Sequence, residues 1–156
     1  MLNSRTRDHA WIAAHIPHQD NMCLLHSVLG WDDFTLQCNV TSHRAADNPL
    51  RAHGQLGAVC GIEYAAQAMA VHGALLAPAD THCARVGYLV SIRGTRLHTA
   101  RLDDIADDLL VEVSCITANE NNILYEFSVS AGGQLLLDGR AAVVLDAALL
   151  SPGVSS

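Results

Sequence analysis

The sequence predicts an α+β fold in which a curled antiparallel sheet wraps around one long central helix. Two observations lead to this prediction. Residues 55–77 are small or apolar on nearly every helical face and precede Pro78, and a helix of this kind is buried rather than half-solvated. Four runs with strand-like patterns then follow along the chain. Because one sheet cannot cover a helix on every side, we also expect a dimer, in which a second subunit covers the rest.

The elements expected before the long helix are short. Residues 10–16 are predicted to form a helix that ends at Pro17. Residues 30–33 give a turn signal, and residues 34–40 alternate apolar and polar side chains, which is the period of a half-buried strand. Residues 43–54 are polar, so we expect a loop that leads into the helix.

The strands expected after the helix are joined mainly by short connections. Residues 118–122 and 131–133 are typical of hairpin turns between the last three strands. The four expected strands cover residues 86–98, 109–117, 123–130 and 134–145. We predict a single domain over residues 1–156, with its core at about residues 12–145 and a C-terminal tail at residues 146–156.

The composition argues against nucleic-acid and membrane partners. The chain of 156 residues carries a net charge of −7, and all nine of its basic residues are arginine. An acidic chain without a basic run lacks the electrostatic footprint of a protein that binds nucleic acid or an anionic membrane surface. Residues 55–77 are long enough to span a bilayer, but Glu63, Gln67 and His72 are each costly in lipid. We therefore expect a soluble core helix and no membrane.

The remaining composition indicates a cytoplasmic protein without a metal site. The first twenty residues contain no apolar run of signal-peptide length. The five cysteines form no CxxC pair and the nine histidines form no HExxH pattern. We expect free, mostly buried thiols and neither a metal nor another cofactor.

Glu63 is the carboxylate at the centre of the predicted helix. We expect it to be buried, where a charge is costly and the pKa of a carboxyl group rises unless the group is paired. A carboxyl group with a raised pKa can act as a general acid or base near neutral pH. A structural partner inside the core, or a position at the edge of the helix facing water, would explain the same residue without catalysis.

Two segments resemble the 3-hydroxyacyl-acyl-carrier-protein dehydratases. The segment IPHQDNMCLLHSVL, residues 16–29, resembles the opening of these enzymes, and GIEYAAQAMAVHGAL, residues 61–75, resembles their central helix, with Glu63, Ala66 and Gln67 matching. The later segments GYLVSIRGTRLHTARL and LLLDGRAAVVL resemble their strands. The resemblance is closest to a divergent branch of predicted dehydratases associated with aryl polyene pigment assembly. It implies the hot-dog fold and the dehydration of 3-hydroxyacyl thioesters in fatty-acid or polyketide-like biosynthesis, without a cofactor.

The chain departs from the better-known dehydratases at the second catalytic residue. Those enzymes place a histidine in a His-Phe-Pro segment fourteen residues before the helix carboxylate, and that count reaches Pro49 here. The histidine nearest to this position in the loop is His53, ten residues before Glu63. His18, which follows Pro17 in the first similar segment, is the other candidate. For either histidine a surface or structural role is the alternative.

The resemblance also implies roles around the carboxylate. Dehydration requires removal of an α-proton, stabilisation of the enolate oxygen and protonation of the leaving hydroxide. Backbone N–H groups of Gly57, Ala58 and Val59, expected in the first turns of the helix, are candidates for holding the oxygen. Gln67, one turn after Glu63, would orient the carboxylate or contact substrate, or would instead form a structural hydrogen bond to the sheet.

Three functions and two kinds of partner remain open from the sequence. A hot-dog thioesterase would use the same carboxylate to activate water, and a noncatalytic acyl-binding subunit would need no histidine. The acyl thioester would be linked to acyl carrier protein or to coenzyme A, and the dimer would be a homodimer or a heterodimer. An acidic carrier protein requires a local patch of arginines, for which Arg85, Arg93, Arg96 and Arg101 are candidates, with a solvated strand face as the alternative.

Overall fold

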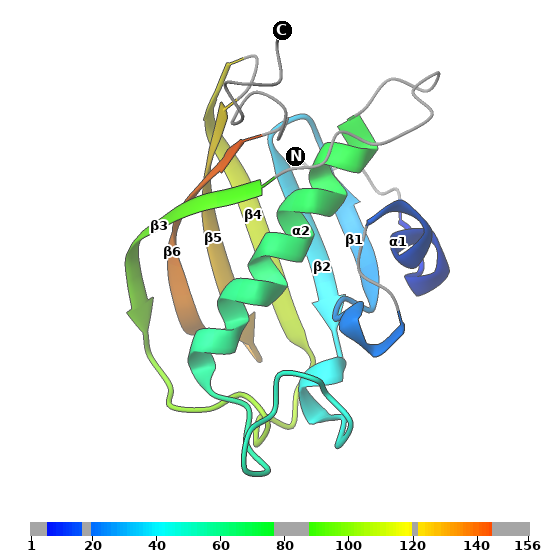
Figure 1. Ribbon diagram of the computed structural model, residues 1–156, viewed down its shortest axis with the longest axis vertical. Helices are drawn as coiled ribbons and strands as arrows, with labels where there is room; N and C mark the ends of the chain where they lie inside the picture. Colours follow the sequence, from blue (N-terminus) through cyan, green and yellow to red (C-terminus); the bar gives the residue numbers. More distant parts are fainter. Residues whose placement is uncertain (1–5, 17–19, 77–87, 120–121, 145–156) are drawn as a thin grey trace, which may run out of the picture.

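A long helix lies across one face of an open, six-stranded antiparallel sheet (Figure 1). The computed structural model describes residues 6–16, 20–76, 88–119 and 122–144. The strands follow the order β1-β2-β4-β5-β6-β3, so that β1 and β3 form the two edges of the sheet. A short helix, α1, lies beside β1 and the central helix α2 (Figure 1). The arrangement confirms the predicted hot-dog fold.

The elements occur in the predicted order. Two short elements, α1 (His9–His15) and the 3-10 turn η1 (Asp20–Met22), precede the first hairpin. The hairpin consists of β1 (Ser27–Trp31) and β2 (Thr35–Val40), and the 3-10 turns η2 (Ser42–Arg44) and η3 (Ala58–Cys60) lead to α2 (Gly61–Leu76). The last four strands are β3 (Tyr88–Leu97), β4 (Leu109–Ala118), β5 (Asn122–Ala131) and β6 (Gln134–Val144).

Most boundaries differ from the sequence prediction by one residue, and two differ in a way that has a structural reason. The turn expected at residues 30–33 begins later, because Gly30 and Trp31 still pair with β2. The central helix begins at Gly61 rather than at residue 55. The reason is tertiary pairing: Gly57 forms a β-bridge with Arg101, and Ala58 N–H donates to the Ala100 carbonyl. The ends expected at residues 77, 86 and 145 lie outside the described residues.

One face of α2 packs closely against the sheet. Tyr64, Ala65 and Ala68 are fully buried on this face. At the start of the helix, a Cβ atom added to Gly61 would lie 2.7 Å from Cδ2 of Leu137 on β6. Glycine at this position therefore lets the helix backbone approach the sheet. The described segment Ala58–Leu76 is long and apolar enough to cross a membrane, but its contact with the sheet is that of a core helix.

A buried hydrogen-bonded group fixes the C-terminal half of α2. His72 is fully buried, its Nε2–H donates to the carbonyl of Asp32 (2.9 Å), and its Nδ1 accepts from the hydroxyl of Tyr125 (2.8 Å). These bonds link the helix to the β1–β2 turn and to β5. Burial lowers the pKa of His72 and raises the pKa of Tyr125 above its ordinary value, so both groups are neutral in the folded protein at neutral pH.

We expect His72 to make the fold sensitive to acid. Its folded pKa lies below the ordinary value of 6.5, so the unfolded chain binds the proton more tightly and the free energy of unfolding falls as the pH drops below about 6.5. Urea unfolding between pH 7.5 and pH 5 measures this slope. His72→Gln should reduce it, whereas His26→Gln, at an exposed position, should not; equal slopes for His72→Gln and wild type would contradict the assignment.

Candidate functional site

Glu63 lies in the first turn of α2, on the side of the helix that the sheet does not cover. Its side chain is exposed in the single chain, so the expectation that the chain itself buries this carboxylate is wrong. Gly61, Tyr64 and Ala65 are buried, and at a helical period of 3.6 residues Glu63 points away from that buried face. A carboxylate in the first turn is stabilised by the positive end of the helix dipole.

The backbone before α2 offers two N–H groups a few residues from Glu63 in the chain. Ala58 N–H donates to the Ala100 carbonyl, which occupies one of the three expected donors. Within the described residues, no acceptor pairs with the N–H groups of Gly57 and Val59. The three residues lie in and just before η3 rather than in α2 itself. The side chain of Val59 is 57% exposed, so this end of the helix is open to a ligand.

Gln67 holds the segment before β1 against the helix. Its side chain is 1% exposed, its Oε1 accepts from Leu24 N–H (2.9 Å) and its Nε2 donates to the Met22 carbonyl (2.7 Å). Both ends of the amide are therefore used by the main chain. These contacts are structural hydrogen bonds of the kind that the sequence left open for Gln67, although they reach the segment before the sheet rather than the sheet.

Only one of the two candidate histidines lies among the described residues. His53 is exposed at the tip of a tight turn, where it and Gly54 both have positive φ angles of 54° and 75°. Ala52 and Gln55 exchange backbone hydrogen bonds across this turn, and the paired positive φ values are those of a type I′ turn. His18 lies outside the described residues. The described part of the chain thus brings no candidate histidine into contact with Glu63.

The loop that carries a histidine in the better-known dehydratases is fastened to α2 by a polar cluster. Asn48 Nδ2 donates to the hydroxyl of Tyr64 (2.8 Å) and to the carbonyl of Ser42 (2.8 Å), while its Oδ1 accepts from Leu50 N–H (2.9 Å). Asn48 is 5% exposed and Tyr64 is fully buried, and burial raises the pKa of Tyr64. The sequence analysis missed this role; the signal was an asparagine directly before Pro49.

Two further residues missed by the sequence analysis hold the neighbouring loops. His43 is fully buried and its Nε2 lies 3.1 Å from the Ile105 carbonyl and 3.0 Å from the Asp107 carbonyl. Asp103 accepts hydrogen bonds from Leu56 N–H (2.8 Å) and from Arg101, whose guanidinium holds the pKa of this carboxyl below its ordinary value. These contacts fix the backbone that leads into η3.

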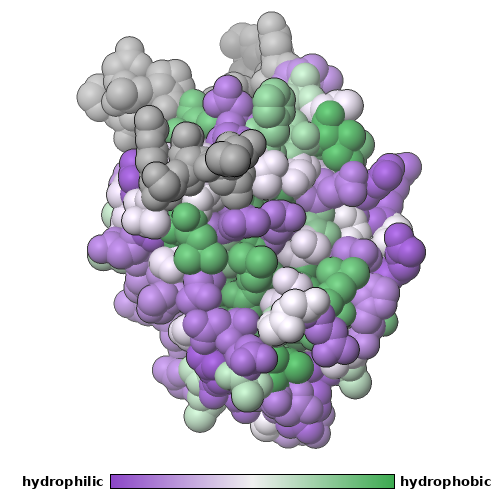
Figure 2. All heavy atoms as spheres, turned by 180° about the vertical axis from the view of Figure 1, so that it is seen from behind, coloured by the Kyte–Doolittle hydropathy of each residue, from purple (hydrophilic) through white to green (hydrophobic). Residues whose placement is uncertain are grey.

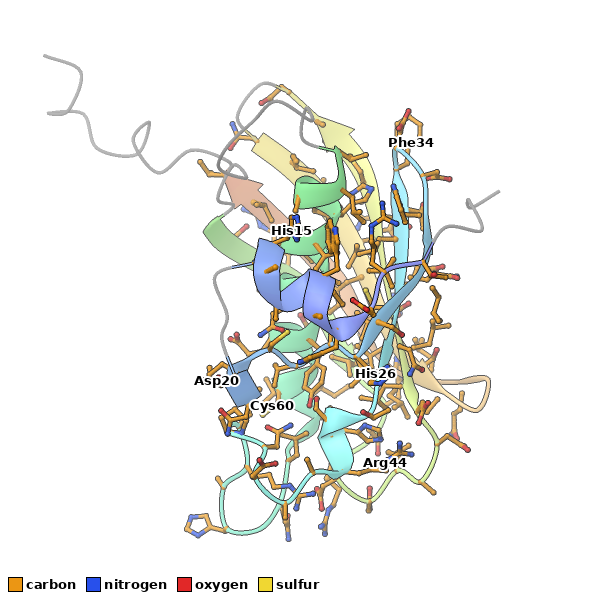
Figure 3. All side chains as sticks on the ribbon, turned by 90° about the vertical axis from the view of Figure 1, so that its right-hand side faces the viewer. His15, Asp20, His26, Phe34, Arg44 and Cys60 are labelled. Atoms are coloured by element: carbon orange, nitrogen blue, oxygen red, sulfur yellow. The ribbon has the colours of Figure 1, made fainter. Side chains whose placement is uncertain are left out.

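Cys60 lies close enough to Glu63 for the carboxylate to affect the pKa of its thiol. Burial, and in second place the Glu63 carboxylate, raise the pKa of the Cys60 thiol, so the thiol is protonated at neutral pH and is no strong nucleophile. Cys60 lies at the end of the molecule that also holds Arg44, opposite the end that holds Phe34 (Figure 3). The candidate site is therefore an open, apolar region at the start of α2 with one carboxylate and two backbone donors.

The comparison with protein families decides which family this arrangement represents. The ApeP dehydratase family matches residues 10–150. The chain belongs to this family. The comparison with curated proteins finds no match.

Solved structures similar to this member of the ApeP dehydratase family are hot-dog proteins. The dehydratase heterocomplex ApeI:P from Xenorhabdus doucetiae gives a TM-score of 0.78 at 23% identity, with 93% of this chain and 97% of that chain covered. A mutant thioesterase from Pseudomonas aeruginosa gives a TM-score of 0.60 at 13% identity, with 90% and 96% covered. Zebra fish thioesterase superfamily member 2 gives 0.60 at 13% identity, with 88% and 92% covered. At these identities the likeness concerns the fold.

We expect Gln67 to contribute to stability through its two main-chain contacts. Gln67→Ala leaves the buried N–H of Leu24 and the carbonyl of Met22 without these partners, which costs about 1–3 kcal/mol of the free energy of unfolding. Urea denaturation measures the loss. Gln55→Ala serves as the control, because Gln55 is exposed and its backbone bonds do not need the side chain. A Gln67→Ala variant as stable as this control would contradict the structural role.

Proposed function

We propose that this protein takes part in the dehydration of 3-hydroxyacyl thioesters to enoyl thioesters, with Glu63 as the proton-transferring group. The observation that carries the proposal is the position of Glu63 in a member of the ApeP dehydratase family. Its carboxylate lies on the uncovered side of α2, and the exposed Val59 and the N–H groups of Gly57 and Val59 precede it by a few residues in the chain. A thioester that enters there meets a proton acceptor and hydrogen-bond donors together.

The proposed reaction moves two protons and releases one water. A base removes the α-proton of the thioester, and the N–H groups of Gly57 and Val59 hold the enolate oxygen that forms. An acid then gives a proton to the 3-hydroxyl group, which leaves as water while the carbon–carbon double bond forms. Glu63 is proposed for one of these transfers, and His53 or His18 for the other. Gln67 acts indirectly in this proposal, by fixing the segment before β1 to the helix.

The site needs a second subunit to exclude water. The uncovered side of α2 carries the half-buried residues Ile62, Ala66 and Ala70 in addition to Glu63. The edge strand β3 ends in Leu97, which is 49% exposed. Unpaired strand edges and exposed apolar surface are typical of subunit interfaces. The similar ApeI:P structure is a heterocomplex, which supports a heterodimer as well as a homodimer for this chain.

Substitution of Glu63 tests the proposed chemistry. Glu63→Gln keeps the shape and removes the titratable group, and loss of a general acid or base costs roughly 10²- to 10⁴-fold in rate. The fold should survive because the side chain is exposed in the single chain. The measurement is the loss of one water from a 3-hydroxyacyl carrier thioester, followed by intact mass, with the protein alone and together with its partner subunit.

The same assay separates the alternative functions and the two histidines. His53→Ala or His18→Ala should approach the loss seen for Glu63→Gln only if that histidine is the second proton carrier, and the pair should then be strongly non-additive. A free acid as the product would identify a thioesterase instead. Wild-type protein that binds acyl thioesters but leaves them unchanged in every assembly would identify a noncatalytic subunit.

We expect the purified chain to assemble. Light scattering at micromolar concentration should give the mass of a dimer, or of a heterodimer once the partner is added, because the edge of β3 and one side of α2 need cover. A stable monomer under both conditions would contradict the proposed arrangement of the site.

A further inference from the structure

The backbone that leads into η3 pairs with the β3–β4 connection as a short antiparallel ladder. Leu102 N–H donates to the Leu56 carbonyl (2.7 Å), and Ala58 N–H donates to the Ala100 carbonyl (3.0 Å). Leu56 and Leu102 are both fully buried. The ladder therefore fixes the chain on both sides of residue 57.

Gly57 lies between these two hydrogen bonds and faces the other way. It forms a β-bridge with Arg101, and this bridge is the non-hydrogen-bonded pair of the ladder, in which the N–H and C=O groups of both residues point outward. Gly57 has extended backbone angles (φ −65°, ψ 151°) and is the N-cap of η3. A Cβ atom added at Gly57 would meet no atom within 4 Å. Its N–H group thus points away from the connection, beside open space.

The carboxylate of Asp103 replaces a main-chain acceptor at the start of this ladder. In a regular antiparallel pair, Leu56 N–H would donate to the Leu102 carbonyl. That carbonyl instead accepts from Ile105 N–H (3.1 Å), where the connection turns. Leu56 N–H donates to Oδ1 of Asp103 (2.8 Å). Asp103 therefore extends the ladder by one hydrogen bond and holds both main-chain polar groups of Leu56 toward the connection.

Burial distinguishes Asp103 from its neighbour Asp104. Both lie at the end of the molecule that carries the β3–β4 connection, which is at the bottom of Figures 1 and 2. Figure 2 shows that this end carries mainly hydrophilic side chains. The side chain of Asp104 is 57% exposed, whereas that of Asp103 is 6% exposed. A carboxylate is kept from water in this way only when it is paired and hydrogen-bonded.

Arg101 neutralises the carboxylate of Asp103. Its Nε donates to Oδ1 of Asp103 (3.0 Å) and its Nη2 donates to Oδ2. The pair keeps net negative charge away from the backbone one residue before Gly57, where it would oppose a forming enolate. Arg101 is thus engaged in the loop, although the sequence grouped it with other arginines as a candidate carrier patch. Arg85, another member of that group, lies outside the described residues.

We propose that Asp103 is a positioning residue for the reaction, because it orients the N–H groups of Gly57 and Val59 toward the enolate oxygen. This inference rests on the proposed dehydratase function. With Leu56 held toward the connection, the next N–H group must face the opposite side, and the first turn of η3, which contains Val59, starts from that direction. Donors to a developing oxyanion are effective when they are fixed before the reaction, and a displacement of about 1 Å costs roughly 10²-fold in rate.

The test separates the position of the acceptor from its charge. Asp103→Asn keeps an oxygen for Leu56 N–H and removes the charge, whereas Asp103→Glu keeps the charge and moves the oxygens by one methylene group. Asp103→Ala removes both. Asp108→Ala is the matched control, because Asp108 lies in the same connection but forms its ion pair with Arg44 (2.6 Å) rather than with the ladder.

Each variant is assembled with its partner subunit where one is required. Dehydration of a 3-hydroxyacyl carrier thioester then gives kcat, KM and the pH profile, and the melting temperature reports the fold. Asp103→Ala and Asp103→Glu should lower kcat by roughly 10- to 100-fold with KM changed by less than about twofold, since the donors act mainly in the transition state. Asp103→Asn and Asp108→Ala should retain a kcat close to that of wild type. The pH profile should keep its shape, because Asp103 transfers no proton.

A purely structural role of Asp103 would give a different pattern. The Ala and Glu variants would then lose thermal stability but keep the kcat of wild type in the folded protein, and this result would overturn the proposal. A kcat loss in Asp103→Asn or Asp108→Ala as large as in Asp103→Glu would also overturn it. The Asn and Glu variants keep the comparison decisive if Asp103→Ala does not fold.

The same experiment distinguishes failure of this inference from failure of the proposed function. Wild type that releases a free acid would refute dehydration, but the kcat comparison would still decide the role of Asp103, because thioester hydrolysis also forms an oxyanion. Wild type that changes no thioester would refute the proposed function and this inference together. An active wild type with unchanged kcat in Asp103→Glu and Asp103→Ala would refute the inference alone.

Discussion

The close packing of α2 on the sheet is the constraint on which the other features depend. Small residues let the helix backbone approach the strands, as at Gly61 against Leu137. This contact leaves the helix with one buried and one uncovered side. The uncovered side carries Glu63 and the start of the helix lies next to the end of β3. The position of the candidate site thus follows from how the helix is seated rather than from a cavity inside the chain.

Polar contacts at both ends of α2 restrict how the helix can move on the sheet. The buried imidazole of His72 joins its C-terminal half to β5 and to the β1–β2 turn. Nearer its start, Tyr64 and Gln67 contact the loop at Asn48 and the segment before β1. A buried polar group stabilises a fold only when its partners are in place. These contacts therefore fix the orientation of the helix about its own axis, and with it the direction of Glu63.

The fold could be predicted from the sequence because its determinants are local. The small and apolar residues on nearly every face of the helix at residues 61–76 and the alternation in the strands do not depend on distant residues. The predictions that were wrong depend on tertiary contacts. The helix starts later because Gly57 and Ala58 pair with the β3–β4 connection. The exposure of Glu63 was not predicted, because nearly uniform small residues give little indication of which side of the helix meets the sheet.

The arginines of β3 and β6 illustrate the same limit in strands. Arg93 and Arg96 would be assigned to opposite faces by their spacing, and Arg140 is far from both in the sequence. Only the pairing register with its extra residue brings the three side chains to one face. Likewise, the hydrogen bond from Arg101 to Asp103 could be expected from the neighbouring charges in the sequence. The hydrogen bond that Asp103 accepts from Leu56 N–H could not. Register and loop closure are global properties of the chain.

The bulge in β3 also limits the geometry of any sheet that continues into another subunit. A β-bulge disrupts the regular ladder and bends the strand locally, so an added strand can pair regularly with β3 only on one side of Gly94. The longer stretch on one side of Gly94 covers residues 88–93, and it contains a second irregularity between Leu89 and Ser91. Slippage by even one residue would exchange the faces of the incoming side chains. The two irregularities therefore restrict the registers in which a partner strand can pair with the edge of β3.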